Sequence, residues 1–281
     1  MFTKTPKAPT SYAGALADAL GTFYRRRWLI RYFVHRQFTR SYQRSYLGFL
    51  WAFLSPLLMV ALLTLVFSEG LGFKFREVVG DSTLNFGLYL YCGLLPFLAY
   101  SEALSKGVNS IRSSSGLIEK VVFPLEILPF TSTVTSLIDK FFGLGALLVV
   151  LALLEQRLHW TVLLLPLVVV PQLLFILGLS YFMAVAGTYL PDIGEMLRAV
   201  VRASFFVTPI LWPASMIPDN LQFLVDYNPL AYLVGAYRAL ILDGNPPGLM
   251  ASAYFSLFAL ALFIGGFALF VKVKPRFADL L

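Results

Sequence analysis

Residues 161–189 read TVLLLPLVVVPQLLFILGLSYFMAVAGTY, a stretch without a single charged side chain. A helix needs about 20 mostly apolar residues to cross the hydrocarbon core of a bilayer, and this stretch is longer than that. Pro166, Pro171 and Gly178 lie within it, so we expect the helix to tilt or kink. This stretch therefore predicts a membrane-spanning helix.

The whole chain has the same character. Of its 281 residues, 58% are apolar and 13% are charged, whereas soluble domains average about 45–50% and about 25%. This composition excludes a water-soluble globular protein, and its apolar content excludes a disordered chain. We predict an all-α integral membrane protein.

Further stretches match the first in length and apolar character. They are Leu47–Phe67, Leu84–Leu104, Phe130–Leu154 and Leu249–Val271, together with the shorter Ala199–Trp212. The short stretch reaches spanning length only if it begins near Glu195 and if Arg198 and Arg202 extend to the membrane surface. The sequence thus predicts six transmembrane helices.

The basic residues predict the orientation. The net charge is +7, and 17 of the 22 Lys and Arg residues fall in the N-terminal segment, alternate loops and the tail. Because basic loops stay in the cytoplasm, both termini should be cytoplasmic. Charges placed between apolar blocks indicate membrane topology rather than nucleic-acid binding. We divide the chain into a cytoplasmic segment 1–46, a transmembrane domain 47–271 and a tail 272–281.

The segment before the first span predicts an amphipathic helix at the membrane interface. Ile30, Phe33, Val34 and Phe38 fall on one helical face, and Arg36, Arg40 and Arg44 form an i+4 series on another. Arg27 and Arg31 project onto the apolar side, which predicts a helix start or bend near them. The arginines could bind phosphate headgroups or act only as a positive-inside anchor.

The predicted outer region 213–248 is apolar between 219 and 241. Asn228 and Pro229 divide it into two pieces of about 10–12 residues, the length of half-membrane helices. Pro229 blocks helix continuation and restricts Asn228. We expect a re-entrant helical pair; the alternative is a surface hairpin.

Motifs of catalysis are missing. The sequence contains no Gly-x-x-x-x-Gly-Lys-Ser/Thr loop for ATP, no paired Cys or His spacing for a metal, and no Asp-x-Asp pair. We predict no catalytic residues, no metal site and no cofactor bound by this chain. Asp139 and Lys140 are expected to have a structural role, and a direct pair between them is doubtful because neighbours diverge on a helix.

Four segments together resemble the membrane subunits of ABC exporters for lipid-linked polysaccharides, the family that exports O-antigen, capsule and teichoic acid. They are RSYQRSYLGFLWAFLSP (40–56), IEKVVFPLEILP (118–129), LPDIGE (190–195) with FFVTPILW (205–212), and Ile217–Pro218 through Tyr227–Pro229 to Arg238. The resemblance covers about residues 25–275 in the same order.

The resemblance implies a homodimer in the bacterial inner membrane that binds two copies of a cytoplasmic ABC ATPase, which carries ATP and Mg²⁺. The loop 105–129 would hold the coupling helix, and the loop before the fifth span would make a second contact. The implied coupling residues are Ile118, Glu119, Lys120, Val121, Phe123, Asp192 and Glu195. Pro124 would end the coupling helix by restricting Phe123.

The resemblance also implies roles along a transport path. Arg36, Arg40 and Arg44 would recognise the pyrophosphate of a polyprenyl-linked glycan, and Asn228 and Pro229 would belong to an outer gate. The implied lining residues are Tyr46, Phe49, Phe53, Phe205, Phe206 and Trp212. The predicted function is export of polyprenyl-pyrophosphate-linked polysaccharide. The alternatives are export of a smaller lipid, lipo-oligosaccharide or drug, and an ATP-independent flippase or membrane transferase.

Overall fold

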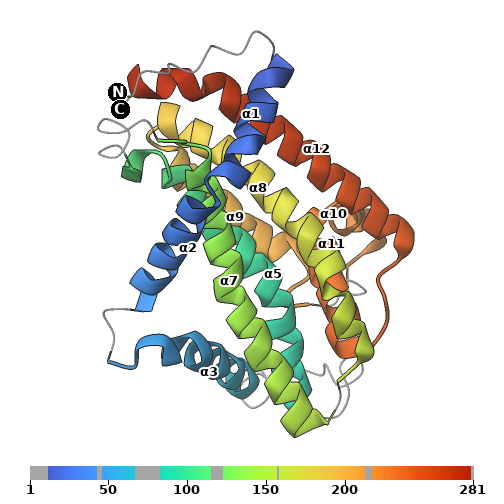
Figure 1. The fold of residues 1–281 in the computed structure, drawn as a ribbon. Coiled ribbons are helices and arrows are strands. Elements are labelled where there is room, and N and C mark those ends of the chain that lie inside the picture. Colours follow the sequence, from blue (N-terminus) through green and yellow to red (C-terminus); the bar gives the residue numbers. More distant parts are fainter. Residues whose placement is uncertain are drawn as a thin grey trace.

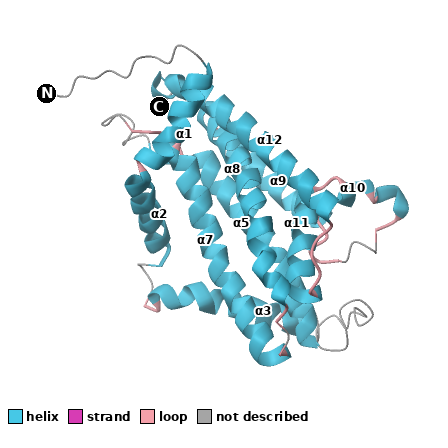
Figure 2. Ribbon diagram, turned by 45° about the vertical axis from the view of Figure 1, so that its right-hand side comes forward, coloured by secondary structure: helices cyan, strands magenta, loops and turns pink. Residues whose placement is uncertain are grey.

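The computed structural model describes residues 12–42, 46–66, 83–114, 123–156, 158–212 and 217–279, and this part of the chain is helical without strands. Figures 1 and 2 show long helices packed into one bundle, with α1 and the last turns of α12 near the same end of it. The longer helices are α1 (Tyr12–Arg25), α2 (Arg27–Tyr42), α3 (Trp51–Leu65), α5 (Thr83–Asn109), α7 (Ile127–Val150), α8 (Leu165–Tyr189), α9 (Ile193–Val207), α11 (Pro229–Arg238) and α12 (Leu249–Val273).

Short elements extend or join these helices. The 3₁₀ turns are η1 (Gly48–Leu50), η3 (Arg112–Ser114), η5 (Trp160–Leu164), η7 (Asp219–Leu221) and η9 (Lys274–Asp279). The π turns η4 (Leu151–Glu155) and η8 (Ala239–Asp243) continue α7 and α11. The four-residue α10 (Phe223–Asp226) lies before α11.

Four segments of the described chain are long and apolar enough to cross a membrane. They are Gly48–Leu65, Ile127–Leu153, Trp160–Tyr189 and Leu249–Phe277. These agree with four of the expected spans. Helix α5 covers a fifth, Leu84–Leu104, and runs on to Asn109.

The expected helix through Trp212 is wrong at its end. Helix α9 stops at Val207, and Thr208 is extended, with φ −82° and ψ 135°. The cause is Pro209, because the residue before a proline is sterically driven out of the helical region. Fifteen residues make α9 about 22 Å long.

The centre of the bundle is held by close helix crossings. Helices α8 and α12 meet at glycines: a Cβ added to Gly178 would lie 2.6 Å from the carbonyl carbon of Leu262. Helices α7, α8 and α5 share a hydrogen-bonded relay, in which Thr133 donates to Ser180 at 3.0 Å and Ser180 donates to the carbonyl of Ala103 at 3.3 Å. Small and hydroxyl side chains at such crossings are typical of membrane helix bundles.

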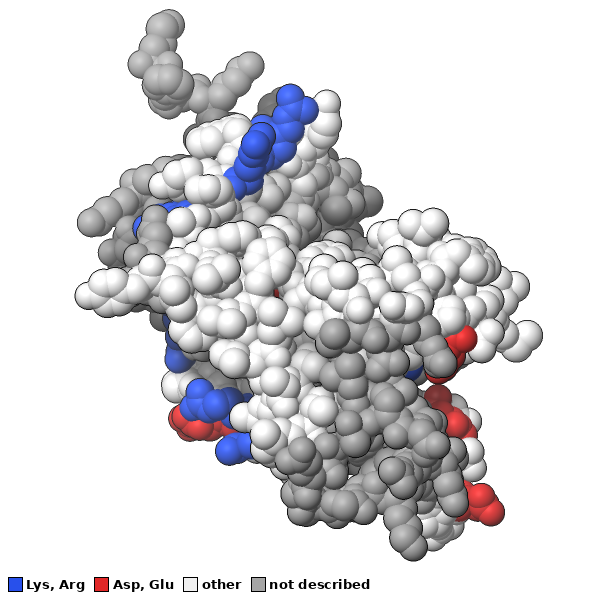
Figure 3. Space-filling model, turned by 90° about the horizontal axis from the view of Figure 1, so that it is seen from below, with Lys and Arg blue, Asp and Glu red and all other residues white. Residues whose placement is uncertain are grey.

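Helix α3 lies at the edge of this bundle, with Ala52, Val60 and Leu63 buried. In both views it crosses the lower parts of α5 and α7 at a steep angle. Its leucines remain exposed, with Leu58, Leu62 and Leu65 at 52%, 58% and 63%. Figure 3, seen from below, shows that most of the residues drawn in colour or white on this face are uncharged, with the larger charged groups towards its edge. The face of α3 that carries these leucines is therefore apolar and exposed within the described chain.

Candidate functional site

Helix α2 packs along α7 with the predicted apolar face inward. Phe33 is buried and lies 5.3 Å from Phe123 between ring centroids, and Phe38 stacks on Phe142 at 5.4 Å. The chain turns at Arg26, between α1 and α2, next to the predicted bend. Arg36 and Arg40 are exposed on α2, and Arg44 lies outside the described residues.

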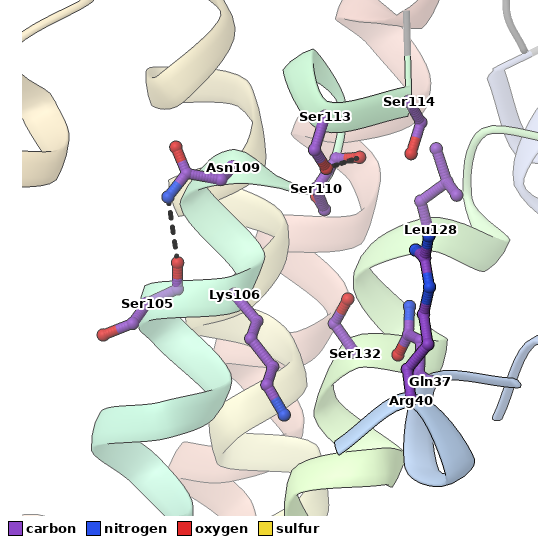
Figure 4. Close-up of a pocket in the computed structure, with 10 residues that line it drawn as sticks. All are labelled: Gln37, Arg40, Ser105, Lys106, Asn109, Ser110, Ser113, Ser114, Leu128 and Ser132. Carbon is purple, nitrogen blue, oxygen red and sulfur yellow. Dashed lines mark hydrogen bonds between the residues drawn. The ribbon is translucent and has the colours of Figure 1, made fainter. Parts of the chain in front are cut away.

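A polar cavity of about 370 Å³ opens between α2, α5, η3 and α7. Figure 4 shows Arg40 and Gln37 on its α2 side, Lys106 on its α5 side and Ser132 of α7 between them. The full lining is Gln37, Arg40, Ser105, Lys106, Asn109, Ser110, Ser113, Ser114, Leu128 and Ser132. Two cations among hydroxyl and amide donors can bind an oxyanion such as a phosphate group.

A chain of ion pairs borders this cavity and joins α5 to α7. Lys106 Nζ lies 2.5 Å from Glu102 Oε1, and Lys140 Nζ lies 2.8 Å from Glu102 Oε2 and 2.7 Å from Asp139 Oδ2. The doubt about a direct Asp139–Lys140 pair was wrong. The two side chains leave the helix in different directions, but the long lysine stem folds back so that the charged tips meet.

Tyr42 connects α2 to this network, because its hydroxyl donates to Asp139 Oδ1. Burial, followed by the hydrogen bond to Asp139, raises the pKa of the Tyr42 hydroxyl above its ordinary value. The phenol therefore stays protonated at physiological pH and remains a donor. Glu102 and Lys106 are an i,i+4 acid–base pair that sequence reasoning could have found.

The predicted coupling residues are only partly described. Ile118, Glu119, Lys120 and Val121 lie outside the described residues, while Phe123 is half-buried against Phe33. At the start of α9, Asp192 and Glu195 are exposed.

Glu195 already has an intramolecular partner, Arg198, whose Nε lies 3.2 Å from its carboxylate. The two side chains form an ion pair on the exposed surface at the start of α9.

The predicted lining aromatics form two separate groups. Phe49 and Phe53 surround Phe142 at 5.0 and 5.4 Å, and Tyr46 is exposed beside them in sequence. Phe205 contacts Phe97 and Phe206 at 5.3 and 5.5 Å, and Trp212 Nε1 donates to the carbonyl of Phe206. No ring contact links the two groups within the described chain.

Asn228 and Pro229 divide the outer region where expected. Asn228 caps α11 by accepting from Leu230 N at 2.9 Å, and Pro229 occupies the first helical turn. The expected length of about 10–12 residues agrees with α11, which has 10 residues, but was wrong for the first piece. The first piece is reduced to the short, exposed η7 and α10, whereas α11 with η8 runs from Pro229 to Asp243 and packs against α5.

Arg238 is a buried residue whose role the sequence did not reveal. It is 6% exposed, donates to the carbonyls of Pro209 and Ile210 at 2.7 Å each and to that of Tyr89 at 3.3 Å. Its guanidinium lies 3.5 Å from the centroid of the Tyr89 ring. A lone arginine in an apolar stretch was the signal that could have identified it.

A family model described as "ABC-2 type transporter" matches residues 29–242. The chain belongs to the ABC-2 type transporter family. The matched range includes most of α2, the polar cavity, the ion-pair network and the Arg238 site. The structural features described above therefore lie within the part of the chain that matches the family model.

Three curated relatives are similar over most of their length. The O-antigen export system permease protein RfbA of Myxococcus xanthus is 29% identical, over 91% of this chain and 96% of that protein. The protein of the same name from Klebsiella pneumoniae is 26% identical, over 85% and 90%. The polysialic acid transport protein KpsM of Escherichia coli is 24% identical, over 84% and 89%. This ABC-2 chain thus resembles these transport proteins over at least 84% of its length.

Proposed function

We propose that this chain is the permease subunit of an ATP-driven exporter. The exporter moves polyprenyl-pyrophosphate-linked polysaccharide from the cytoplasm across the bacterial inner membrane. The similarity to O-antigen and polysialic acid permeases over at least 84% of the chain carries the proposal. The polar cavity supports it, because it offers cations and hydroxyls to a phosphate-bearing substrate at one end of the bundle.

The proposed topology has six spans with both termini in the cytoplasm. Four long apolar helices and α5 support five of them. Helix α9, about 22 Å long, is shorter than the roughly 30 Å hydrocarbon core. We propose that α9 and the extended residues after it cross together, and that α11 enters the membrane from the outer side as the re-entrant element.

The proposed assembly is a homodimer with the path at the subunit interface. Helices α3 and α9 both present apolar side chains outward, among them Leu62 at 58%, Val200 at 58% and Phe206 at 68%. A two-fold dimer is the commonest closed assembly. It would bring the two groups of lining aromatics, around Phe49 and around Phe205, to one interface.

The energy source is proposed to be a separate cytoplasmic ABC ATPase in two copies. Co-purification should recover this ATPase, and vesicles containing both proteins should export the lipid-linked glycan only with ATP. We expect Glu119→Arg combined with Phe123→Ala to abolish export while membrane insertion is retained, since both residues lie in the proposed coupling segment.

The matched control is Glu77→Arg with Phe75→Ala in the predicted outer loop, which should export normally. Normal export by the coupling variant would contradict the coupling assignment. Export by the permease without any ATPase would overturn the proposed function itself, and transport of short lipids alone would favour the smaller-substrate alternative.

The pyrophosphate is proposed to bind at Arg36, Arg40 and Arg44, with the polar cavity beside Arg40 receiving the phosphate oxygens. Loss of one charge-assisted hydrogen bond costs about 1.5–3 kcal/mol. Arg40→Ala should therefore weaken binding of a polyprenyl pyrophosphate by roughly ten-fold or more, measured by titration in nanodiscs. Arg276→Ala, which removes an exposed arginine from the tail, is the control. Equal affinity of the two variants for polyprenyl pyrophosphate would show that the arginine series does not bind the substrate and acts only as a positive-inside anchor.

A further inference from the structure

A second cavity, of about 300 Å³, lies between α10, α11 and the first turns of α12. Helix α12 has 25 residues and is about 37 Å long. The last turn of α12 packs on Phe277, so this cavity, which is lined by the first turns, lies at the other end of α12. In the proposed topology that end is extracytoplasmic. Its lining residues are Asp226, Tyr227, Asn228, Pro229, Tyr232, Met250, Ala251, Tyr254, Phe255 and Phe258.

The floor of this cavity is rigid. The rings of Tyr232 and Phe255 stack at 4.7 Å with 28° between their planes, and the Tyr232 hydroxyl bonds to Ser252 Oγ at 2.9 Å. Asn228 is fixed on both sides of its amide, to Leu230 N and to Thr208 Oγ1. These residues give a fixed shape, because their polar atoms are already used within the protein.

The side chains at the rim of this cavity are exposed, and their polar groups are free to bind a ligand. Tyr227 is 80% exposed and Tyr254 is 71% exposed, and Asp226 is exposed beside Tyr227. Within the described chain, the Asp226 carboxylate and the two phenol hydroxyls have no hydrogen-bond or ion-pair partner. The cavity thus combines a preformed aromatic floor with three polar groups that are available to a ligand.

We propose that this cavity binds a short segment of neutral glycan as it emerges on the outer face. Aromatic rings pack against the C–H face of a pyranose ring, and a carboxylate accepts hydrogen bonds from its hydroxyls. A volume of about 300 Å³ is at the small end of ligand sites, which run from about 300 to 1,000 Å³. The inference rests on the proposed export function and adds to it an outer subsite.

The charge of the cavity lining determines which class of glycan the cavity can bind. Asp226 is the charged residue of the lining, so the site has a negative charge with no cation to offset it. Sugars that carry carboxylates or phosphates would be repelled, and an acyl chain would leave the carboxylate and phenols unused. The site therefore selects neutral sugars, in contrast to the cationic cavity at the other end.

The test uses the full chain with its ATPase in nanodiscs, applied to an array of neutral hexose and deoxyhexose oligosaccharides and of oligosialic acids. We expect binding to neutral oligosaccharides, no binding to oligosialic acids, and a loss of about ten-fold or more in the double variant Tyr227→Ala with Tyr254→Ala. Asp226→Asn should reduce the preference for neutral over acidic probes.

The control is Trp160→Ala, which removes an exposed aromatic outside the cavity, 68% exposed, and should bind as the unmodified protein does. Absence of neutral-glycan binding, or equal binding by the double variant and the control, would overturn the inference. ATP-dependent export, measured on the same preparations, separates the two proposals. Export without binding to the array would contradict the outer subsite alone, whereas absence of export would contradict the proposed function.

Discussion

We expect the substitution Gly178→Leu to prevent folding of the bundle, with the largest loss of stability of any change considered. A Cβ at this position would lie 2.6 Å from the carbonyl carbon of Leu262 and 2.7 Å from Phe263 N. These are backbone atoms, which cannot rotate away as a side chain can. The cost should exceed the roughly 1–3 kcal/mol of ordinary overpacking, since α8 and α12 must separate along their whole contact.

The measurement is the melting temperature in detergent together with the amount of monodisperse protein recovered. Gly145→Leu on α7 is the matched control, because a Cβ there has nothing within 4 Å. Gly178→Ala should show an intermediate loss. If Gly178→Leu and Gly145→Leu had the same melting temperature, the α8–α12 crossing would not be as close as it is in the structure.

We expect Arg238→Met to have the second largest effect, by releasing α11 from α5 and from the chain after α9. The substitution keeps the apolar stem but leaves the carbonyls of Pro209 and Ile210 without their donor. A buried carbonyl without a hydrogen-bond donor costs about 1–3 kcal/mol, so the loss of the donor to two carbonyls should cost about 2–6 kcal/mol. Because these segments form the outer part of the proposed path, export should fall with stability.

Thermal unfolding and vesicle export would be measured for Arg238→Met, Arg238→Lys and the exposed control Arg276→Met. Lysine keeps the charge but lacks the planar fork that reaches several carbonyls while lying on Tyr89, so it should rescue only part of the loss. Unchanged stability in Arg238→Met would show that the guanidinium is not the link between these segments.

Periodicity and hydropathy predicted most of the helices because the hydrocarbon core fixes their length. Helices α8 and α12 agree with their predicted ranges, and the turn at Arg26 agrees with the arginines that did not fit the apolar face. The sequence analysis did not predict the end of α9, although Pro209 indicates a helix end at this position. The prediction extended an apolar run and gave too little weight to the proline.

The candidate sites were predicted less completely than the helices. Arg40 was identified from its i+4 series, but its cavity partners Lys106 and Ser132 lie on other helices. Asn228 and Pro229 were identified as a boundary, whereas Tyr254, on the facing helix, was not. A site made by several helices has no local pattern, because spacing along one helix says nothing about which neighbour it faces.

The sequence by itself determined that the chain is a membrane protein, where its long helices lie, and where they break at Asn228–Pro229. These follow from local properties: apolar length, charge placement and the backbone limits of proline. Only the tertiary structure decided that Lys140 pairs with both Asp139 and Glu102. It also decided that Arg238 is buried and donates hydrogen bonds to the carbonyls after α9. Each depends on which helices meet, and at Gly178 that is decided by how closely two backbones can approach.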